Sequence, residues 1–130
     1  MNVGTYKFKS SQAQELIAYV ANQYGRDLEF LWERFSDNAI WRREDNGKWF
    51  GALLTVKRNK IIPGDDDSLI EILDVRCAPD VIDFIVDKKK IFPGWHMNKR
   101  HWITIVLDGR MDMPQIYSLL DNSYELAYGK

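Results

Sequence analysis

The chain has 130 residues, of which 45% are hydrophobic and 28% are charged, and its formal net charge is −1. This balance predicts a globular protein of one domain, residues 1–130, and excludes a disordered chain, a coiled coil and a collagen-like chain. The near-neutral charge argues against a protein that coats nucleic acid through bulk charge. The single cysteine, Cys77, excludes an internal disulfide bond and a zinc site built on cysteines.

The sequence carries no feature of a secreted or membrane-spanning protein. Its first nine residues lack the apolar core of a signal peptide. No apolar run approaches the roughly 18 residues that a membrane span needs. We therefore expect a cytoplasmic protein without membrane contact.

The first predicted element is a helix over residues 11–24. Ser10 and Ser11 are both good N-caps, and Ser11 followed by Gln14 resembles a capping box. Apolar residues then recur at helical spacing, and Gly25 is a natural helix stop. For residues 26–37 we expect a helical turn that runs into a loop and packs Trp32 and Phe35 on the core.

A β-hairpin is predicted next, around Asn46-Gly47. This dipeptide suits a two-residue type I′ turn, because both positions of that turn need a positive φ. The strands would cover about 39–45 and 48–57, with Trp41 opposite Ala52.

The second half of the chain alternates strands and helices. Residues 63–67 form a turn or surface loop. Strands are predicted over 69–77 and 103–107, and helices begin near Pro79 and after Asp112. This order favours an α+β two-layer sandwich, in which an antiparallel sheet is covered on one face by the N- and C-terminal helices.

Charge is distributed unevenly along the chain. Residues 39–60 carry six basic and two acidic side chains, net +4, and residues 88–101 carry five basic and no acidic ones, net +5. Between them, residues 61–87 carry eight acids and one arginine, net −7. If the two basic segments share a surface, the protein has a cationic face. The alternative is that each run is a solvated surface interleaved with acids.

The most unusual segment is 91–102, where two Trp and two His flank a polar centre. One arrangement is a tight turn at Asn98-Lys99, which would set His96 opposite His101 and Trp95 opposite Trp102. Aromatic rings beside Lys and Arg suit single-stranded nucleic acid or a phosphate ligand. Alternatively, the tryptophans are core or edge residues and the histidines are half-buried hydrogen-bonding groups.

Other chemistry finds little support in the sequence. The two histidines lack a third metal ligand or a recognised metal motif. Cys77 follows an apolar strand, which favours a small buried side chain over a nucleophile. Asp65, Asp66 and Asp67 lack the spacing of a calcium loop. We expect no cofactor, no metal and no enzymatic activity.

One block of the sequence, FPGWHMNKRHWIT at residues 92–104, resembles the hallmark of the MmcQ/YjbR family. The resemblance extends over nearly the whole chain, through residues 46–50, 73–79, 107–109 and 123–126. It implies a CyaY-like (frataxin-like) α+β fold in a small bacterial protein of a family described as DNA-binding on structural grounds. Frataxin's iron binding does not transfer, because it uses an acidic first helix and helix 11–24 has only Glu15.

Three hypotheses for function follow. The first is a non-enzymatic, monomeric module that binds DNA or another nucleic acid through phosphate contacts. Its site residues would be Arg42, Arg43, Lys48, Arg76, Trp95, His96, Asn98, Lys99, Arg100 and His101, with Asn98 holding the turn. The second is a protein- or small-ligand-binding module in which the same segment recognises an acidic partner. The third is an enzyme that uses His96 or His101 as a general base.

Overall fold

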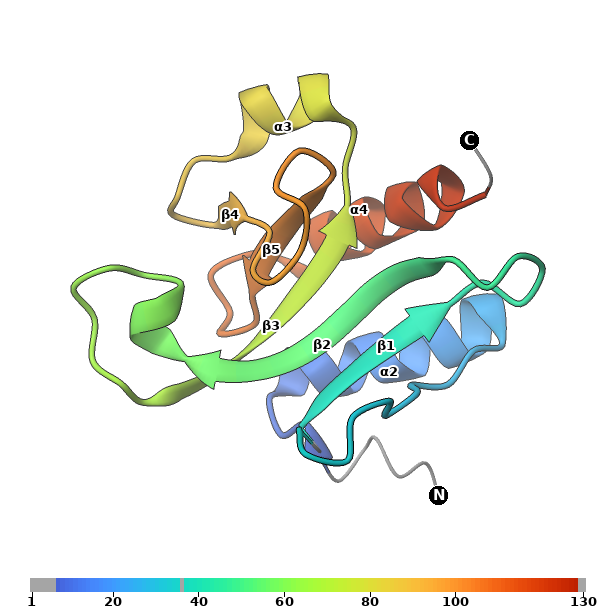
Figure 1. Ribbon diagram of the computed structural model, residues 1–130, viewed down its shortest axis with the longest axis horizontal. Helices are drawn as coiled ribbons and strands as arrows, with labels where there is room; N and C mark the ends of the chain where they lie inside the picture. Colours follow the sequence, from blue (N-terminus) through green and yellow to red (C-terminus); the bar gives the residue numbers. More distant parts are fainter. Residues whose placement is uncertain (1–6, 36, 129–130) are drawn as a thin grey trace.

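The computed structural model describes residues 7–35 and 37–128, and within them five strands form one antiparallel sheet of order β1-β2-β3-β5-β4. The strands are β1 (Asn38–Arg42), β2 (Trp49–Lys57), β3 (Leu69–Arg76), β4 (Ile91–Pro93) and β5 (Trp102–Val106). The helices are α2 (Ser11–Tyr24), α3 (Pro79–Ile85), α4 (Met113–Leu126) and the short 3₁₀ helix η1 (Arg58–Lys60). Both long helices lie behind the sheet in Figure 1, which confirms the α+β two-layer architecture.

The first helix forms as its sequence predicts, except for the capping box. Ser10 is the N-cap, and its hydroxyl accepts a hydrogen bond from the Ala13 amide. Gly25 ends the helix in the left-handed conformation at φ 64°. Ser11 already lies inside the helix, and the Gln14 side chain donates to the Phe8 carbonyl. The capping box predicted for Ser11 is therefore wrong.

The main core lies between the sheet and the two long helices. Trp41, Phe50 and Leu53 from the hairpin face Leu16 of α2 and Leu120 of α4, and all five are fully buried. Burial of large apolar side chains is the main stabilising contribution to such a domain. Hydrogen bonds also join the two long helices, since the Tyr19 and Tyr24 hydroxyls of α2 donate to Asp121 of α4.

The hairpin forms, but its predicted register and turn are wrong. Trp41 pairs with Gly51 and not with Ala52, and the register shifts between Trp41 and Arg42. Gly47 alone in the turn has a positive φ, so the turn is not type I′. A Cβ on Gly51 would lie 3.0 Å from the Trp41 ring, so glycine lets that ring pack closely. The irregularity sends Phe50 to the helix side and Ala52 to the other face.

The segment after α2 also differs from its prediction. Residues 27–32 are not helical, and Glu29 pairs with Ile40 at the outer edge of β1. Trp32 and Phe35 remain 36% and 52% exposed, so neither packs into the core. The amide of Phe35 donates to the Trp32 carbonyl, so one turn does form at residues 32–35, and the predicted packing of Trp32 and Phe35 on the core is what fails.

The rest of the chain follows its sequence pattern closely. β3, α3, β5 and α4 form where they are predicted, and residues 63–67 lie in an exposed loop. The sequence did not predict β4, which is short and contains Pro93. In the described part of the chain, none of the helices is long and apolar enough to cross a bilayer.

Candidate functional site

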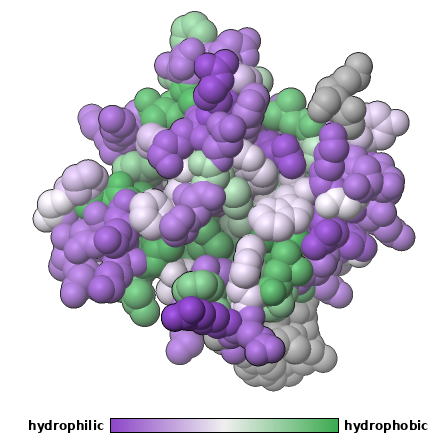
Figure 2. Space-filling model, viewed as in Figure 1, coloured by the Kyte–Doolittle hydropathy of each residue, from purple (hydrophilic) through white to green (hydrophobic). Residues whose placement is uncertain are grey.

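The face of the sheet away from the long helices carries the unusual segment of the sequence. A second apolar cluster lies here, with Ile40, Ala52 and Ile72 buried at its centre. The loop of residues 94–101 covers it, and Trp95 and Met97 pack against it. Figure 2 looks onto this face, where green and pale side chains gather over the middle of the sheet among purple ones.

The 94–101 loop is fixed to the sheet at its first residues. A Cβ on Gly94 would lie 2.8 Å from Trp102, so only glycine fits there. The Trp95 amide donates to the Thr104 hydroxyl at 2.8 Å, and that hydroxyl donates to Asp74 at 2.5 Å. Asp74 is fully buried, and this burial raises the pKa of its carboxyl to about 8.

The far end of the loop is closed by its own residues. The Asn98 side chain accepts from the Arg100 amide at 2.9 Å, and the Asn98 carbonyl accepts from His101 at 3.0 Å. Lys99 donates to the Gly94 carbonyl at 3.0 Å, which ties the two ends together. Asn98 therefore holds the turn, as predicted.

The predicted pairing across the loop is wrong. Gly94, not Trp95, lies opposite Trp102, because its amide donates to the Trp102 carbonyl at 3.2 Å. His96 has a φ of 61°, which is rare for a residue with a side chain. Its ring lies 4.5 Å from the Trp95 ring. Such backbone strain is concentrated at functional sites in proteins.

A groove with a cationic rim lies on one side of the loop. We call it the lysine groove, and its volume is about 280 Å³. Trp95 belongs to its apolar lining, and three lysines are among the lining residues. It is lined by Lys60, Ile61, Pro63, Lys88, Phe92, Pro93, Trp95 and Lys99, with no acidic side chain among these residues.

The turn that carries Lys88 is held by a dense set of hydrogen bonds. Lys88 has a φ of 58° and is, like His96, a non-glycine residue with a strained backbone conformation. The Asp87 carboxylate accepts from the amides of Ile91, Lys89 and Lys90, which lowers its pKa to about 2. These bonds fix the backbone from which the Lys88 side chain extends to the groove.

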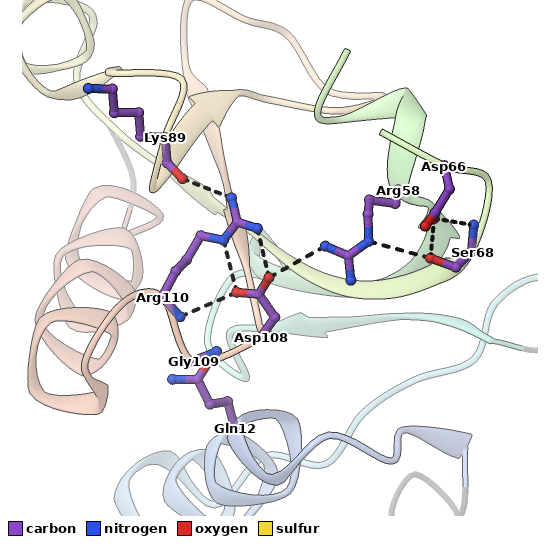
Figure 3. Close-up of polar contacts among 8 residues, drawn as sticks. All are labelled: Gln12, Arg58, Asp66, Ser68, Lys89, Asp108, Gly109 and Arg110. Carbon is purple, nitrogen blue, oxygen red and sulfur yellow. Dashed lines mark hydrogen bonds and ion pairs between the residues drawn. The ribbon is translucent and has the colours of Figure 1, made fainter. Parts of the chain in front are cut away.

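A network of two arginines and one aspartate also contacts this turn. Arg110 donates to the Lys89 carbonyl at 3.0 Å and to the Asp108 carboxylate at 2.9 and 2.7 Å (Figure 3). Arg58 forms an ion pair with the Asp108 carboxylate at 3.6 Å. Arg58 belongs to η1, the same short helix that carries Lys60. The paired Arg110 guanidinium lowers the pKa of Asp108. The segments that supply Lys60 and Lys88 are thus joined through one carboxylate.

A second groove lies on the other side of the loop. We call it the aromatic groove, and its volume is about 450 Å³, within the range of small-molecule sites. Three aromatic rings come from the 27–35 segment and β2, and the loop supplies the facing wall. It is lined by Trp32, Phe35, Asn38, Trp49, Ala52, Leu54, His96 and Met97.

The structure separates the basic residues that the sequence singled out before the loop. Arg43 is buried, where it binds Asp45 and the Tyr124 carbonyl and stacks on the Tyr124 ring. Arg42 pairs with Glu29 at 3.0 Å. Lys48 is exposed at the hairpin tip and lines neither groove.

Arg76 is also engaged within the fold. Its guanidinium donates to the Trp49 carbonyl at 2.5 Å and lies 4.8 Å over the Trp102 ring. Burial lowers its pKa. Arg76 lines a small pocket with His101 at the end of the loop, whereas Arg42, Arg43 and Lys48 line neither groove.

The loop residues on the predicted list are divided between the two grooves and the exposed end of the loop. Trp95 and Lys99 line the lysine groove, and His96 lines the aromatic groove. Arg100 and His101 are exposed at the far end of the loop. His101 lines neither groove, and its carbonyl accepts from the Cys77 amide.

Sequence reasoning missed Lys60 and Lys88 as site residues. Both belong to the two basic segments, 39–60 and 88–101, whose charge was noted. The segments do meet, through these two lysines and Lys99. Within residues 7–35 and 37–128, no three His, Cys, Asp or Glu side chains are placed to hold a metal ion.

Comparison with known sequences gives a consistent family match. The sequence profile described as YjbR matches residues 22–126. A Bacillus subtilis protein named "Uncharacterized protein YyaQ" is 33% identical over 114 residues, which cover 88% of this chain and 96% of that protein. An Escherichia coli protein named "Uncharacterized protein YjbR" is 34% identical over 56 residues, 42% of this chain and 48% of that protein.

Solved structures show the same fold. A crystal structure of a Pseudomonas syringae protein superposes with a TM-score of 0.82 at 32% identity, covering 88% of this chain and 97% of that one. A Deinococcus radiodurans protein whose structure is described as a DUF419 domain superposes at 0.67, with 19% identity and coverage of 89% and 78%. At that identity, the second likeness shows the fold alone.

Proposed function

The chain belongs to the YjbR family, and on that premise we propose that it is a non-catalytic module that binds nucleic acid along the 94–101 loop. The observation that carries the proposal is the lysine groove, which Lys60, Lys88 and Lys99 line together with apolar and aromatic residues. Ammonium groups contact phosphates as point charges, and the aromatic lining suits the sugar and base beside them.

The rigidity of the groove supports this function. Lys88 lies on a turn fixed by Asp87, and Lys99 is tied to the Gly94 carbonyl. The Lys99 ammonium has three donors and uses one in this bond, so two remain for a ligand. Because Lys99 and the backbone of the Lys88 turn are already held in place, binding a phosphate there costs less ordering than on a free loop.

The absence of catalysis is part of the proposal. The His96 ring packs on Trp95, and among the described residues no carboxylate or hydroxyl is hydrogen-bonded to either imidazole. A general base needs such an orienting partner. We further place the module in the cytoplasm as a monomer, the location and state expected from the sequence.

Salt dependence of oligonucleotide binding tests this proposal. We expect a labelled 20-nucleotide strand to lose about twentyfold in affinity between 50 and 200 mM salt, as for three phosphate contacts. In Lys60→Gln/Lys88→Gln the loss should shrink to about threefold, because one phosphate contact remains. Fluorescence anisotropy measures both affinities, and circular dichroism checks the fold.

A matched control separates the groove from overall charge. Lys9→Gln/Lys48→Gln removes the same two charges from exposed positions that line neither groove. This variant should keep the salt dependence of the wild type. The proposal would be overturned if both double variants lost the same affinity between 50 and 200 mM salt. It would also be overturned if the wild type did not bind the strand at 50 mM salt.

A further inference from the structure

We propose that the aromatic groove holds a nucleobase, so that the bound strand is single-stranded. This inference rests on the function proposed above and adds a second contact on the other side of the same loop. Trp95 lines the lysine groove while its neighbours His96 and Met97 line the aromatic groove. The two grooves are thus separated by a single stretch of backbone, as a phosphate and its base are separated by one sugar.

The aromatic rings of this groove are presented rather than buried. Trp32 is 36% exposed and Phe35 is 52% exposed. The Trp32 ring meets the Trp49 ring edge to face, with centroids 5.9 Å apart and planes at 85°. Flat rings with open faces stack on any of the bases, which makes such a contact independent of sequence.

The segment that carries these rings is fixed to the sheet. Glu29 and Ile40 exchange backbone hydrogen bonds of 2.8 and 2.9 Å, and the Glu29 carboxylate binds Arg42. The Phe35 carbonyl accepts from the Asn38 amide at 3.1 Å, which ties the segment to the start of β1. Arg42 therefore supports the groove from outside, although it lines neither groove.

One residue of the groove wall, Asn38, has an unused hydrogen-bond acceptor. The side-chain oxygen of Asn38 is buried and has no partner within the described residues. Buried polar atoms are nearly always paired in native structures, so an unpaired one in a groove wall is a place for a ligand donor. Each base carries an N–H group on its edge, either an exocyclic amine or a ring N–H. A base that stacks on the rings can offer that donor to Asn38.

A duplex does not fit this arrangement. Its bases are stacked and paired, and turning one out of the helix costs a few kcal/mol. A single strand presents its bases without that cost. The lysine groove alone would bind either form through phosphates, so the preference for single strands comes from the aromatic groove.

The test compares three probes of equal length: a single-stranded DNA 20-mer, the same strand in a duplex, and an abasic strand with the same phosphates. We expect the 20-mer to bind about tenfold more tightly than the abasic strand, as one or two stacked bases provide. Trp32→Ala should bring the 20-mer close to the abasic affinity and leave the abasic affinity unchanged. Phe84→Ala, which removes an 89% exposed ring on α3, is the matched control and should change neither.

The outcomes separate the two proposals. Equal affinities for the 20-mer, the duplex and the abasic strand would overturn the base site and leave the phosphate site standing. An equal loss for both single strands in Trp32→Ala would also overturn the base site. No binding of any probe at 50 mM salt would overturn the proposed function itself.

Discussion

The two faces of the sheet are covered in different ways. The helix face is sealed by α2 and α4, and its buried Ser123 hydroxyl is paired with both the Arg76 amide and the Phe50 carbonyl. The loop face is covered by irregular segments. It carries both grooves and both non-glycine residues of positive φ found among the described residues, Lys88 and His96.

Unpaired polar atoms follow the same division. Four buried side-chain atoms in the described part of the chain have no hydrogen-bond partner. Three of them, on Asn38, Asp74 and Trp95, border the loop face, and the fourth is on Trp41 in the helix-side core. Unpaired groups and strain cost stability. We infer that the helix face stabilises the fold, while the loop face gives up stability for binding.

The largest expected effect is a loss of stability when the packing on the helix face is disrupted. Leu120 is fully buried, and Leu120→Ala should cost about 2–5 kcal/mol in the free energy of unfolding. Met97→Ala on the loop face should cost about 1 kcal/mol, because Met97 is only half-buried. Urea unfolding followed by circular dichroism measures both.

Binding should show the opposite order. Oligonucleotide affinity should fall in Met97→Ala, which lines the aromatic groove, and stay unchanged in folded Leu120→Ala. If Leu120→Ala is too unstable, Ile116→Val on the same helix, at about 1 kcal/mol, replaces it. A loss of affinity from the helix-side variants that matches Met97→Ala would contradict the division.

The next effect sharpens the comparison through the buried carboxyl beneath the loop. Burial raises the pKa of Asp74 to about 8, against about 4 for an unfolded chain, so the folded protein binds more protons between these values. Stability should therefore fall as pH rises through this window, by about 1–3 kcal/mol from pH 5 to pH 8. Asp87 and Tyr19, with pKa values shifted to about 2 and about 12, titrate outside it.

Asp74→Asn removes the titrating group while keeping its shape. Urea midpoints at pH 5 and pH 8 should then differ much less than in the wild type, and the variant should be more stable than the wild type at pH 8. Asp83→Asn, an exposed carboxylate on α3, serves as control and should retain the wild-type slope. If the pH dependence of the urea midpoint were unchanged in Asp74→Asn, another group would dominate the pH dependence of stability in this range.

The sequence predicted what depends on neighbours along the chain. The caps at Ser10 and Gly25 and the apolar spacing between them fix α2 locally. The register of the hairpin depends instead on a distant contact. A Cβ on Gly51 would lie 3.0 Å from the Trp41 ring and 3.4 Å from Leu120, a packing constraint that no turn motif reveals.

The site was predictable in the same uneven way. The 94–101 loop was recognisable because its unusual residues are contiguous. Arg43 looked like a surface cation, but besides Asp45 it binds the Tyr124 carbonyl, 81 residues away, and is buried. Lys60 and Lys88 meet at one groove, and the Arg58–Asp108–Arg110 network joins the segments that carry them. Convergence of this kind is a property of the fold and not of any segment.

The smallest expected effect concerns the acidic loop next to the lysine groove. Pro63 lines that groove, and the exposed Asp65 and Asp67 follow it closely in the chain. Their charges should repel a phosphate strand at that end, weakly, because solvent and salt screen exposed charges. Asp65→Asn/Asp67→Asn should therefore raise oligonucleotide affinity about twofold at 50 mM salt, and the gain should vanish at 200 mM.

A charge-matched control decides whether this effect is local. Asp83→Asn/Glu125→Gln removes two exposed carboxylates that line neither groove. Anisotropy should show a smaller gain in this variant than in the loop variant. An equal gain would mean that the strand responds to net charge alone, and the lysine groove would then lose its place as the site of phosphate contact.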